Sequence, residues 1–116
     1  MKKLDAFTHF DWEAFSKGKT FEVTAVNPWA DYNNPGSVLG TVIEVVIIED
    51  HTAYPPTKDG KPVSNRYERL RIKVPQNSLA VSVGDIVEPV NAVAVVYGEY
   101  RNQLSVKAND IKLVLL

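Results

Sequence analysis

From residue 19 onward, apolar and polar residues alternate in short runs rich in Val, Ile and Thr, and Gly, Pro, Asn and Asp interrupt these runs. This pattern is typical of β-strands joined by turns. It predicts five strands, at residues 21–27, 40–50, 65–74, 86–97 and 103–113. The second run is apolar at every position from Val42 to Ile48 except Glu44, which favours a strand covered on both faces.

The connections between these runs indicate the fold. Residues 76–84 leave room for a turn or one short helix, and no long amphipathic pattern appears that would join parallel strands. The chain is therefore predicted to be all-β and a single domain over residues 1–116. We expect a five-stranded Greek-key OB-fold barrel at residues 20–114, after a short N-terminal extension at residues 1–19. A small β-sandwich is the alternative. Two long connections, at residues 28–39 and 51–64, favour the barrel, because OB-folds hold ligands between such loops.

The N-terminal extension carries four aromatic residues near helical spacing, namely Phe7, Phe10, Trp12 and Phe15. Asp11 is placed to cap a short helix that starts at Trp12. We expect one or two helical turns whose aromatic side chains close one end of the core. No function is assigned to them.

Composition narrows the class of protein. The chain has no cysteine, which excludes disulfides, thiolate metal sites and cysteine nucleophiles. No apolar run approaches the roughly 20 residues of a membrane helix, and the first residues lack the apolar stretch of a secretory leader. We therefore expect a soluble protein of the cytoplasm that does not bind a membrane.

Charge is distributed unevenly, although the whole chain has a net charge of only −1. Residues 57–73 hold six Lys and Arg against Asp59 and Glu68, whereas residues 1–56 hold four Lys against eight Asp and Glu. A basic stretch thus lies inside an otherwise acidic chain, and any binding to a polyanion has to occur there.

The third predicted strand contains most of this basic stretch. Because strand side chains alternate between faces, Leu70, Ile72 and Val74 are expected to build the core. The opposite face then carries Tyr67, Arg69, Arg71 and Lys73. Cations beside an aromatic ring are typical of single-strand binding, in which cations follow the phosphates and bases stack on rings. A solvated face that only keeps the protein soluble, with Glu44 and Glu68 neutralising part of it, is the alternative.

Further aromatic and basic residues lie in the connections beside this strand. They are Trp29 and Tyr32 in the first long loop, Tyr54, Lys58 and Lys61 in the second, and Tyr97, Tyr100 and Arg101 between the last two strands. Lys107 joins them from the outward face of the fifth strand, with Gln103 and Ser105. Exposed aromatic residues beside cations favour a surface that a ligand covers. With the third-strand residues, these are the candidate nucleic-acid-binding residues.

No catalytic constellation is found. His9 and His51 stand alone, and the chain has no zinc-protease, nucleophile-elbow or phosphate-loop motif. Glu49 and Asp50 are adjacent on a predicted strand and so point to opposite faces. We expect no enzyme activity, no cofactor and no metal site.

A set of short motifs, taken in their order, resembles the OB-fold single-stranded DNA-binding proteins of phages and mobile elements of Gram-positive bacteria, lactococcal phages in particular. The motifs are Asn27-Pro28-Trp29, the run from Gly40 to Ile47, Asp59-Gly60-Lys61, Gly84-Asp85-Ile86-Val87 and the run from Tyr100 to Ala108. The resemblance covers residues 20–114. It implies binding of single-stranded DNA without strong sequence preference, in phage DNA replication or recombination in the host cytoplasm. It also implies self-association and a phage recombinase or replication protein as partner. We expect the self-association to be a dimer, since linking several weak sites along a strand raises affinity.

The C-terminus departs from bacterial single-strand binders, which usually end in a disordered tail with an acidic tip. Here the last residues are Lys112-Leu113-Val114-Leu115-Leu116. Recruitment of partners by such a tail is not expected, and the apolar end should finish the fifth strand or pack on a second subunit.

An OB-fold protein-interaction adaptor is the second functional hypothesis. Tyr, Trp and Arg are also the favoured anchors of protein interfaces, so the same surface could meet a protein. Binding to a fluorescent oligo-dT discriminates between the two.

Overall fold

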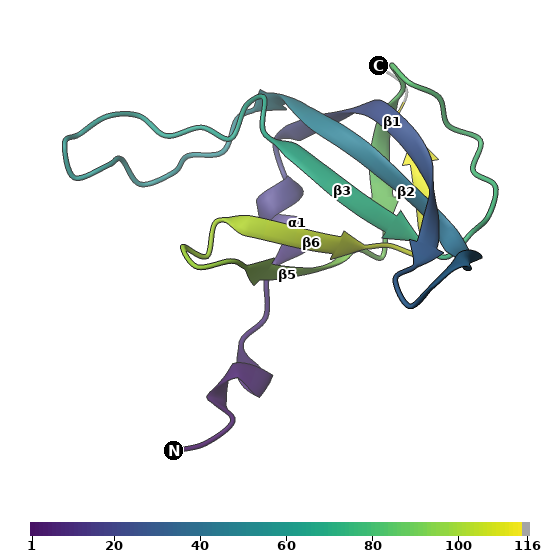
Figure 1. The fold of residues 1–116 in the computed structure, drawn as a ribbon. Helices are drawn as coiled ribbons and strands as arrows, with labels where there is room; N and C mark the ends of the chain where they lie inside the picture. The colour runs from purple at the N-terminus through teal and green to yellow at the C-terminus, as the bar shows by residue number, and fades with distance from the viewer. Residues whose placement is uncertain (115–116) are drawn as a thin grey trace.

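Seven strands form one curled sheet in the computed structural model, which describes residues 1–114 (Figure 1). The order across the sheet is β5-β6-β3-β2-β1-β4-β7. The strands are β1 (Lys19–Asp31), β2 (Asn34–Asp50), β3 (Arg69–Val74), β4 (Ile86–Val90), β5 (Val93–Tyr97), β6 (Gln103–Lys107) and β7 (Asp110–Leu113). Two short helical segments precede them, η1 (Leu4–Phe7) and α1 (Trp12–Ser16). The prediction of an all-β protein is confirmed.

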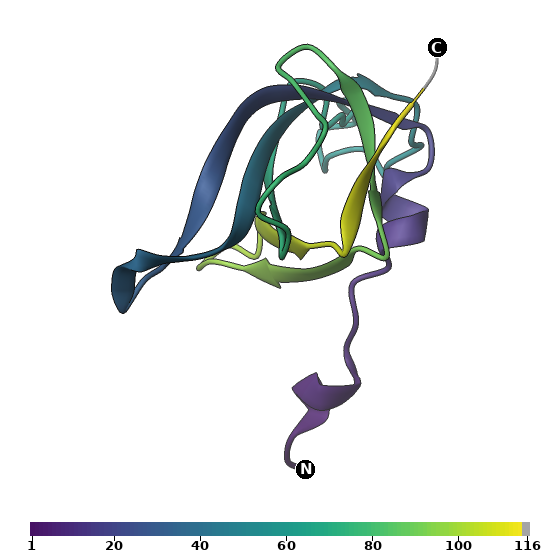
Figure 2. The same ribbon diagram turned by 90° about the vertical axis from the view of Figure 1, so that its right-hand side faces the viewer.

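The first two strands are longer than predicted and form an extended hairpin whose tip bends away from the rest of the sheet (Figure 2). The prediction that the first strand ends before Pro28 is wrong, because β1 runs on to Asp31. Pro28 is tolerated because β4 pairs with β1 only at Phe21 and Glu22, so no described strand pairs with the outer edge of β1 beside Pro28. Most of the expected loop at residues 28–39 is therefore strand.

The last two predicted strands are each interrupted. Residues 86–97 divide into β4 and β5 at Asn91, whose φ of 53° lies in the left-handed region that asparagine tolerates. Residues 103–113 divide into β6 and β7 at Ala108 and Asn109. Each break redirects the chain, so that β4 pairs with β1 and β7 while β5 pairs with β6.

The third strand begins later than predicted, at Arg69 rather than at residue 65. Tyr67 lies in a turn with a φ of 73°, and its N–H donates to the carbonyl of Ile47. The strand β3 then pairs with β2 along its length, from Arg69 opposite Val46 to Val74 opposite Thr41.

The core lies inside the curl of the sheet. Leu70, Ile72 and Val74 are buried, as the alternation of β3 predicted. They pack with residues of the other strands, namely Phe21, Val23, Ile43, Val45, Ile47, Val87, Ala94 and Val106, and with Ala108 after β6. Burial of this set supplies the main stabilisation of the fold.

The N-terminal aromatic residues close one end of this core, as predicted, except for Phe7. The Asp11 carboxylate accepts the N–H of Ala14 at 3.1 Å and so caps α1. Trp12 is buried and stacks on Phe21 at a ring-centroid distance of 5.8 Å. Phe7 is 79% exposed on the segment that projects from the body (Figures 1 and 2).

Two further connections complete the described chain. Residues 51–64 form an arm that extends far from the sheet (Figure 1). Residues 75–85 contain a turn at Val83 and Gly84 and no helix. Within residues 1–114, neither helical segment is long and apolar enough to cross a membrane. Leu115 and Leu116, on which part of the predicted self-association rests, lie outside the described residues.

Candidate functional site

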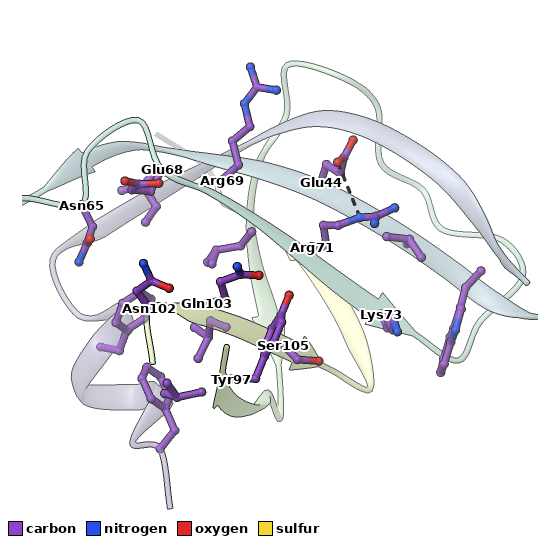
Figure 3. Close-up of a pocket in the computed structure, with 18 of the residues that line it drawn as sticks. Glu44, Asn65, Glu68, Arg69, Arg71, Lys73, Tyr97, Asn102, Gln103 and Ser105 are labelled. Atoms are coloured by element: carbon purple, nitrogen blue, oxygen red, sulfur yellow. Dashed lines mark ion pairs between the residues drawn. The ribbon is translucent and has the colours of Figure 1, made fainter. Parts of the chain in front are cut away.

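An open groove of about 1420 Å³ runs over the outer face of β2 and β3 (Figure 3). The end of the β1–β2 hairpin bounds it on one side, through Trp29 and Tyr32. The β5–β6 hairpin bounds it on the other, through Tyr97 and Gln103. The groove therefore joins segments that are far apart in the sequence.

The floor of the groove carries the basic side chains of β3. Arg69 and Arg71 are exposed and Lys73 is half-buried, and all three line the groove. The Arg71 Nε lies 3.7 Å from the Glu44 carboxylate on β2, and the two side chains are 69% and 38% exposed. Such a pair contributes little to stability, so Arg71 can exchange Glu44 for a ligand anion at small cost. No ion pair involves Arg69 or Lys73 within residues 1–114.

Trp29 forms the aromatic end of the groove. It is half-buried on β1, and the Lys73 Nζ lies 5.6 Å from its ring centroid. This distance is within the range of a cation–π contact. The pair places a positive charge and a flat aromatic surface side by side.

Gly40 allows this end of the groove to form. It pairs with Trp29 across the hairpin, and a side chain at this position would collide with the carbonyl oxygen of Val74 at the end of β3. The absence of a Cβ lets β2 pass directly beside the end of β3. Close packing of β2 against the end of β3 thus explains why a glycine begins the run from Gly40 to Ile47.

The opposite bank consists of the β5–β6 hairpin. Tyr97 is 48% exposed and pairs with Gln103, and Val95 pairs with Ser105. Arg101 lies in the turn between the strands, where its N–H donates to the Gly98 carbonyl. This bank adds one aromatic ring and one cation to the groove.

The net charge of the groove is only weakly positive. Its four cations are Arg69, Arg71, Lys73 and Arg101, and its three acids are Asp31, Glu44 and Glu68. Three of the cations lie along β3 and the fourth, Arg101, lies in the β5–β6 turn, whereas the acids lie apart from one another on the hairpin, on β2 and before β3. An anion is therefore attracted by the cations that it lies next to, and not by the net charge of the whole groove.

Seven of the thirteen predicted site residues line the groove. They are Trp29, Tyr32, Arg69, Arg71, Lys73, Tyr97 and Arg101. The other six do not line it. They are Tyr54, Lys58, Lys61, Tyr67, Tyr100 and Lys107.

The residues outside the groove have distinct surroundings. Lys58 and Lys61 are exposed at the tip of the projecting arm. Tyr67 lies in the turn before β3 rather than on its basic face, and the Arg66 guanidinium covers its ring at 4.8 Å. Tyr100 is exposed in the β5–β6 turn, and Lys107 pairs with Lys73 where β6 meets β3.

Several polar residues of the groove had not been predicted as site residues. They are Asp31 and the six that Figure 3 labels, namely Glu44, Asn65, Glu68, Asn102, Gln103 and Ser105. Gln103 and Ser105 were expected to face outward, and the alternation of the fifth strand is the signal that could have found them. Asn65, Glu68 and Asn102 lie in turns, where the sequence has no periodicity to indicate a face.

A buried ion pair fixes the root of the arm. The Lys19 Nζ lies 3.4 Å from the Asp50 Oδ1, and neither side chain is accessible to solvent. The same ammonium group donates to the Phe15 carbonyl at 2.6 Å and to the Thr52 hydroxyl at 2.9 Å. Lys19 thereby ties α1, β1 and the start of the arm together.

Asp50 joins both ends of the arm. It accepts the N–H of Thr52 at 3.1 Å, the N–H of Asn65 at 2.8 Å and the Tyr54 hydroxyl at 2.9 Å. Burial acts to raise the pKa of Asp50, but the hydrogen bonds from Asn65, Thr52 and Tyr54 outweigh it and hold this pKa well below its usual range. Asp50 is thus an anion at neutral pH that anchors the arm, and Tyr54 is part of this anchor.

The chain is an all-β protein with a groove that combines basic and aromatic side chains on the outer face of its sheet. Within residues 1–114, no three His, Cys, Asp or Glu residues lie close enough to hold a metal ion. A scan against protein-family models, a search of curated proteins and a search of solved structures each found no match to this chain.

Proposed function

We propose that the protein is a non-enzymatic single-stranded DNA-binding protein, largely independent of sequence, and that the groove is its binding site. The observation that carries this proposal is the contact between Lys73 and Trp29, with Arg69 on the same floor and Tyr97 on the facing bank. Each linkage of a DNA strand has a negative charge and each base has two flat faces. A groove with cations along its floor and aromatic rings at its sides suits both features.

Selectivity for single strands follows from the same chemistry. Bases can stack on Trp29 or Tyr97 only when they are not stacked within a duplex. The cations alone would attract any nucleic acid, but the groove has only a weak net charge. The aromatic contacts should therefore decide the preference.

We also propose that the fold is an OB-type barrel. If β4 and β5 are taken as one bent strand, and β6 and β7 as another, five strands remain. The last of these pairs in parallel with β3, and the fourth returns to pair with β1, which supports closure of the sheet into a barrel. OB-folds bind oligonucleotides on the face of their second and third strands, between the loops that join strands one to two and four to five. The groove occupies the corresponding position.

The resemblance to phage single-strand binders supports a role in phage DNA replication or recombination, in the host cytoplasm, beside a recombinase or replication protein.

We include self-association in this proposal. Val93 and Val95 are 68% and 61% exposed on β5, which lies at the end of the sheet order. An uncharged edge strand of this kind favours pairing with another chain. Light scattering that shows a monomer at tens of micromolar would contradict the proposed self-association.

Fluorescence anisotropy with a labelled oligo-dT tests the proposed function. We expect micromolar or tighter binding, and much weaker binding to a duplex of the same length, because only the single strand offers its base faces. The affinity should fall with salt, with a slope of about −0.7 for each phosphate that the groove neutralises.

Equal affinity for the single strand and the duplex would contradict the proposal that the protein binds single-stranded DNA selectively. The exposed valines of β5 also suit the protein-interaction adaptor. Absence of oligo-dT binding at low salt would favour that second function.

A further inference from the structure

The strands β3 and β6 leave a wedge-shaped opening between them at one end of the groove. They pair at only two positions, Ile72 with Val106 and Lys73 with Lys107. From there the two strands separate toward Arg69 and Gln103 (Figure 3). We call the space between them the β3–β6 opening.

The β3–β6 opening has an apolar floor. Among the apolar side chains that line the groove are six from the N-terminal segment, β2, β3, β5 and β6, namely Phe10, Phe15, Ile47, Leu70, Val96 and Leu104. Leu70 and Leu104 come directly after Arg69 and Gln103, where β3 and β6 stand apart. Phe10 and Phe15 pack on each other with ring centroids 5.2 Å apart. Such a floor suits a flat apolar surface, which the face of a nucleobase provides.

The rim of the β3–β6 opening is polar and carries a carboxylate. Glu68 and Asn65 stand on the β3 side, and Asn102 and Gln103 extend toward them from the β6 side (Figure 3). Glu68 has no ion pair within residues 1–114. The Asn65 amide nitrogen donates to the Tyr54 hydroxyl at 2.9 Å, which leaves its oxygen as an acceptor. The Glu68 carboxylate and the Asn65 side-chain oxygen are therefore the hydrogen-bond acceptors on the β3 side.

This rim differs from the basic floor in what it can hold. A phosphate beside Glu68 would be repelled, whereas an amino group would donate to the carboxylate. Cytosine presents an exocyclic amino group as a donor where thymine presents a carbonyl oxygen, an acceptor. Asn102 and Gln103 can donate and accept, and so can complete the contact with the rest of the base edge.

We propose that the β3–β6 opening takes one unpaired base and prefers a base that carries an exocyclic amino group, so that cytosine is bound better than thymine. This inference rests on the proposed function, because the strand that supplies the base is held by the groove. It adds one selective position to a surface that otherwise accepts any sequence.

Competition between oligo-dC and oligo-dT of equal length, at pH 7.5, tests this inference. The variant is Glu68→Gln, which keeps the size of the side chain and removes its charge. The matched control is Glu88→Gln, an exposed strand glutamate on β4 that does not line the groove. We expect the parent protein to bind oligo-dC about fivefold or more tightly than oligo-dT, since a well-placed contact to a base edge is worth at least this ratio.

The Glu68→Gln variant should bring this ratio close to one, and the Glu88→Gln variant should keep it. Equal binding of the two oligonucleotides by the parent overturns the inference, as does a ratio that survives Glu68→Gln, and in both cases the proposed function stands. Binding of neither oligonucleotide by the parent overturns the proposed function and the inference together.

Discussion

Replacing Lys19 with Met should lower the free energy of unfolding by about 3 to 5 kcal/mol, because Asp50 would remain buried as an anion without its cation. The hydrogen bonds that hold the pKa of Asp50 low also prevent it from escaping this cost by taking up a proton near neutral pH. Urea denaturation of Lys19→Met beside the parent measures the loss.

The exposed pair between His51 and Glu49 gives the matched control. Their side chains are 74% and 57% exposed, with 3.6 Å between the Nε2 and Oε2 atoms. Glu49→Ala should change the free energy of unfolding by less than about 0.5 kcal/mol. If Lys19→Met also changes the free energy of unfolding by so little, the arm is not anchored by the pair of Lys19 and Asp50.

The same anchor gives the stability a definite pH dependence. Asp50 has a lower pKa in the folded protein than its ordinary value of 3.8, so its contribution is fully present above that value. As the pH falls below 3.8, the unfolded chain takes up a proton first, and the contribution is progressively lost. Asp50→Asn should therefore lose less stability than the parent between neutral and acid pH.

Replacing Gly40 with Ala should destabilise the protein by about 1 to 3 kcal/mol, as overpacking does elsewhere. The added Cβ would meet the Val74 carbonyl oxygen and lie 2.8 Å from the Pro75 Cα, and backbone cannot move aside as a side chain can. Because Gly40 pairs with Trp29, the aromatic end of the groove should shift with it. Thermal unfolding and oligo-dT binding measure the two effects.

Gly36, on the same strand, is the control for this change. Its nearest neighbour would be the Asn34 side chain at 3.8 Å, which is ordinary contact. Gly36→Ala should leave the melting temperature and DNA binding almost unchanged. A Gly40→Ala protein that behaves like Gly36→Ala would show that the two strands do not approach as closely as described.

The sequence correctly predicted those parts of the fold that depend on residues close together in the chain. The alternation from Leu70 to Val74 has the period of a strand, and it correctly divided β3 into a buried and a basic face. Asp11 was correctly identified as the cap of α1, because the cap and the N–H that it binds are three residues apart. Both signals need only a few neighbouring residues.

The parts that were missed depend on distant contacts. Tyr67 leaves the strand because its N–H bonds to Ile47 and because Asp50 holds Asn65, and no pattern near Tyr67 reveals either bond. The break at Asn91 lies within a continuous run from Ile86 to Tyr97, and it follows from β4 and β5 pairing with different strands. Turn residues such as Glu68 and Asn102 enter the groove for the same reason.

Tryptophan emission during titration with unlabelled oligo-dT tests most directly whether the groove is the DNA site. The chain has two tryptophans, of which Trp12 is buried in the core and Trp29 lines the groove. We predict saturable quenching by oligo-dT, little quenching by a duplex, and loss of the quenching in Trp29→Phe, a change that keeps an aromatic ring for stacking. Oligo-dT binding that leaves the emission of Trp29 unchanged, or quenching that persists in Trp29→Phe, would contradict the assignment of the groove as the binding site.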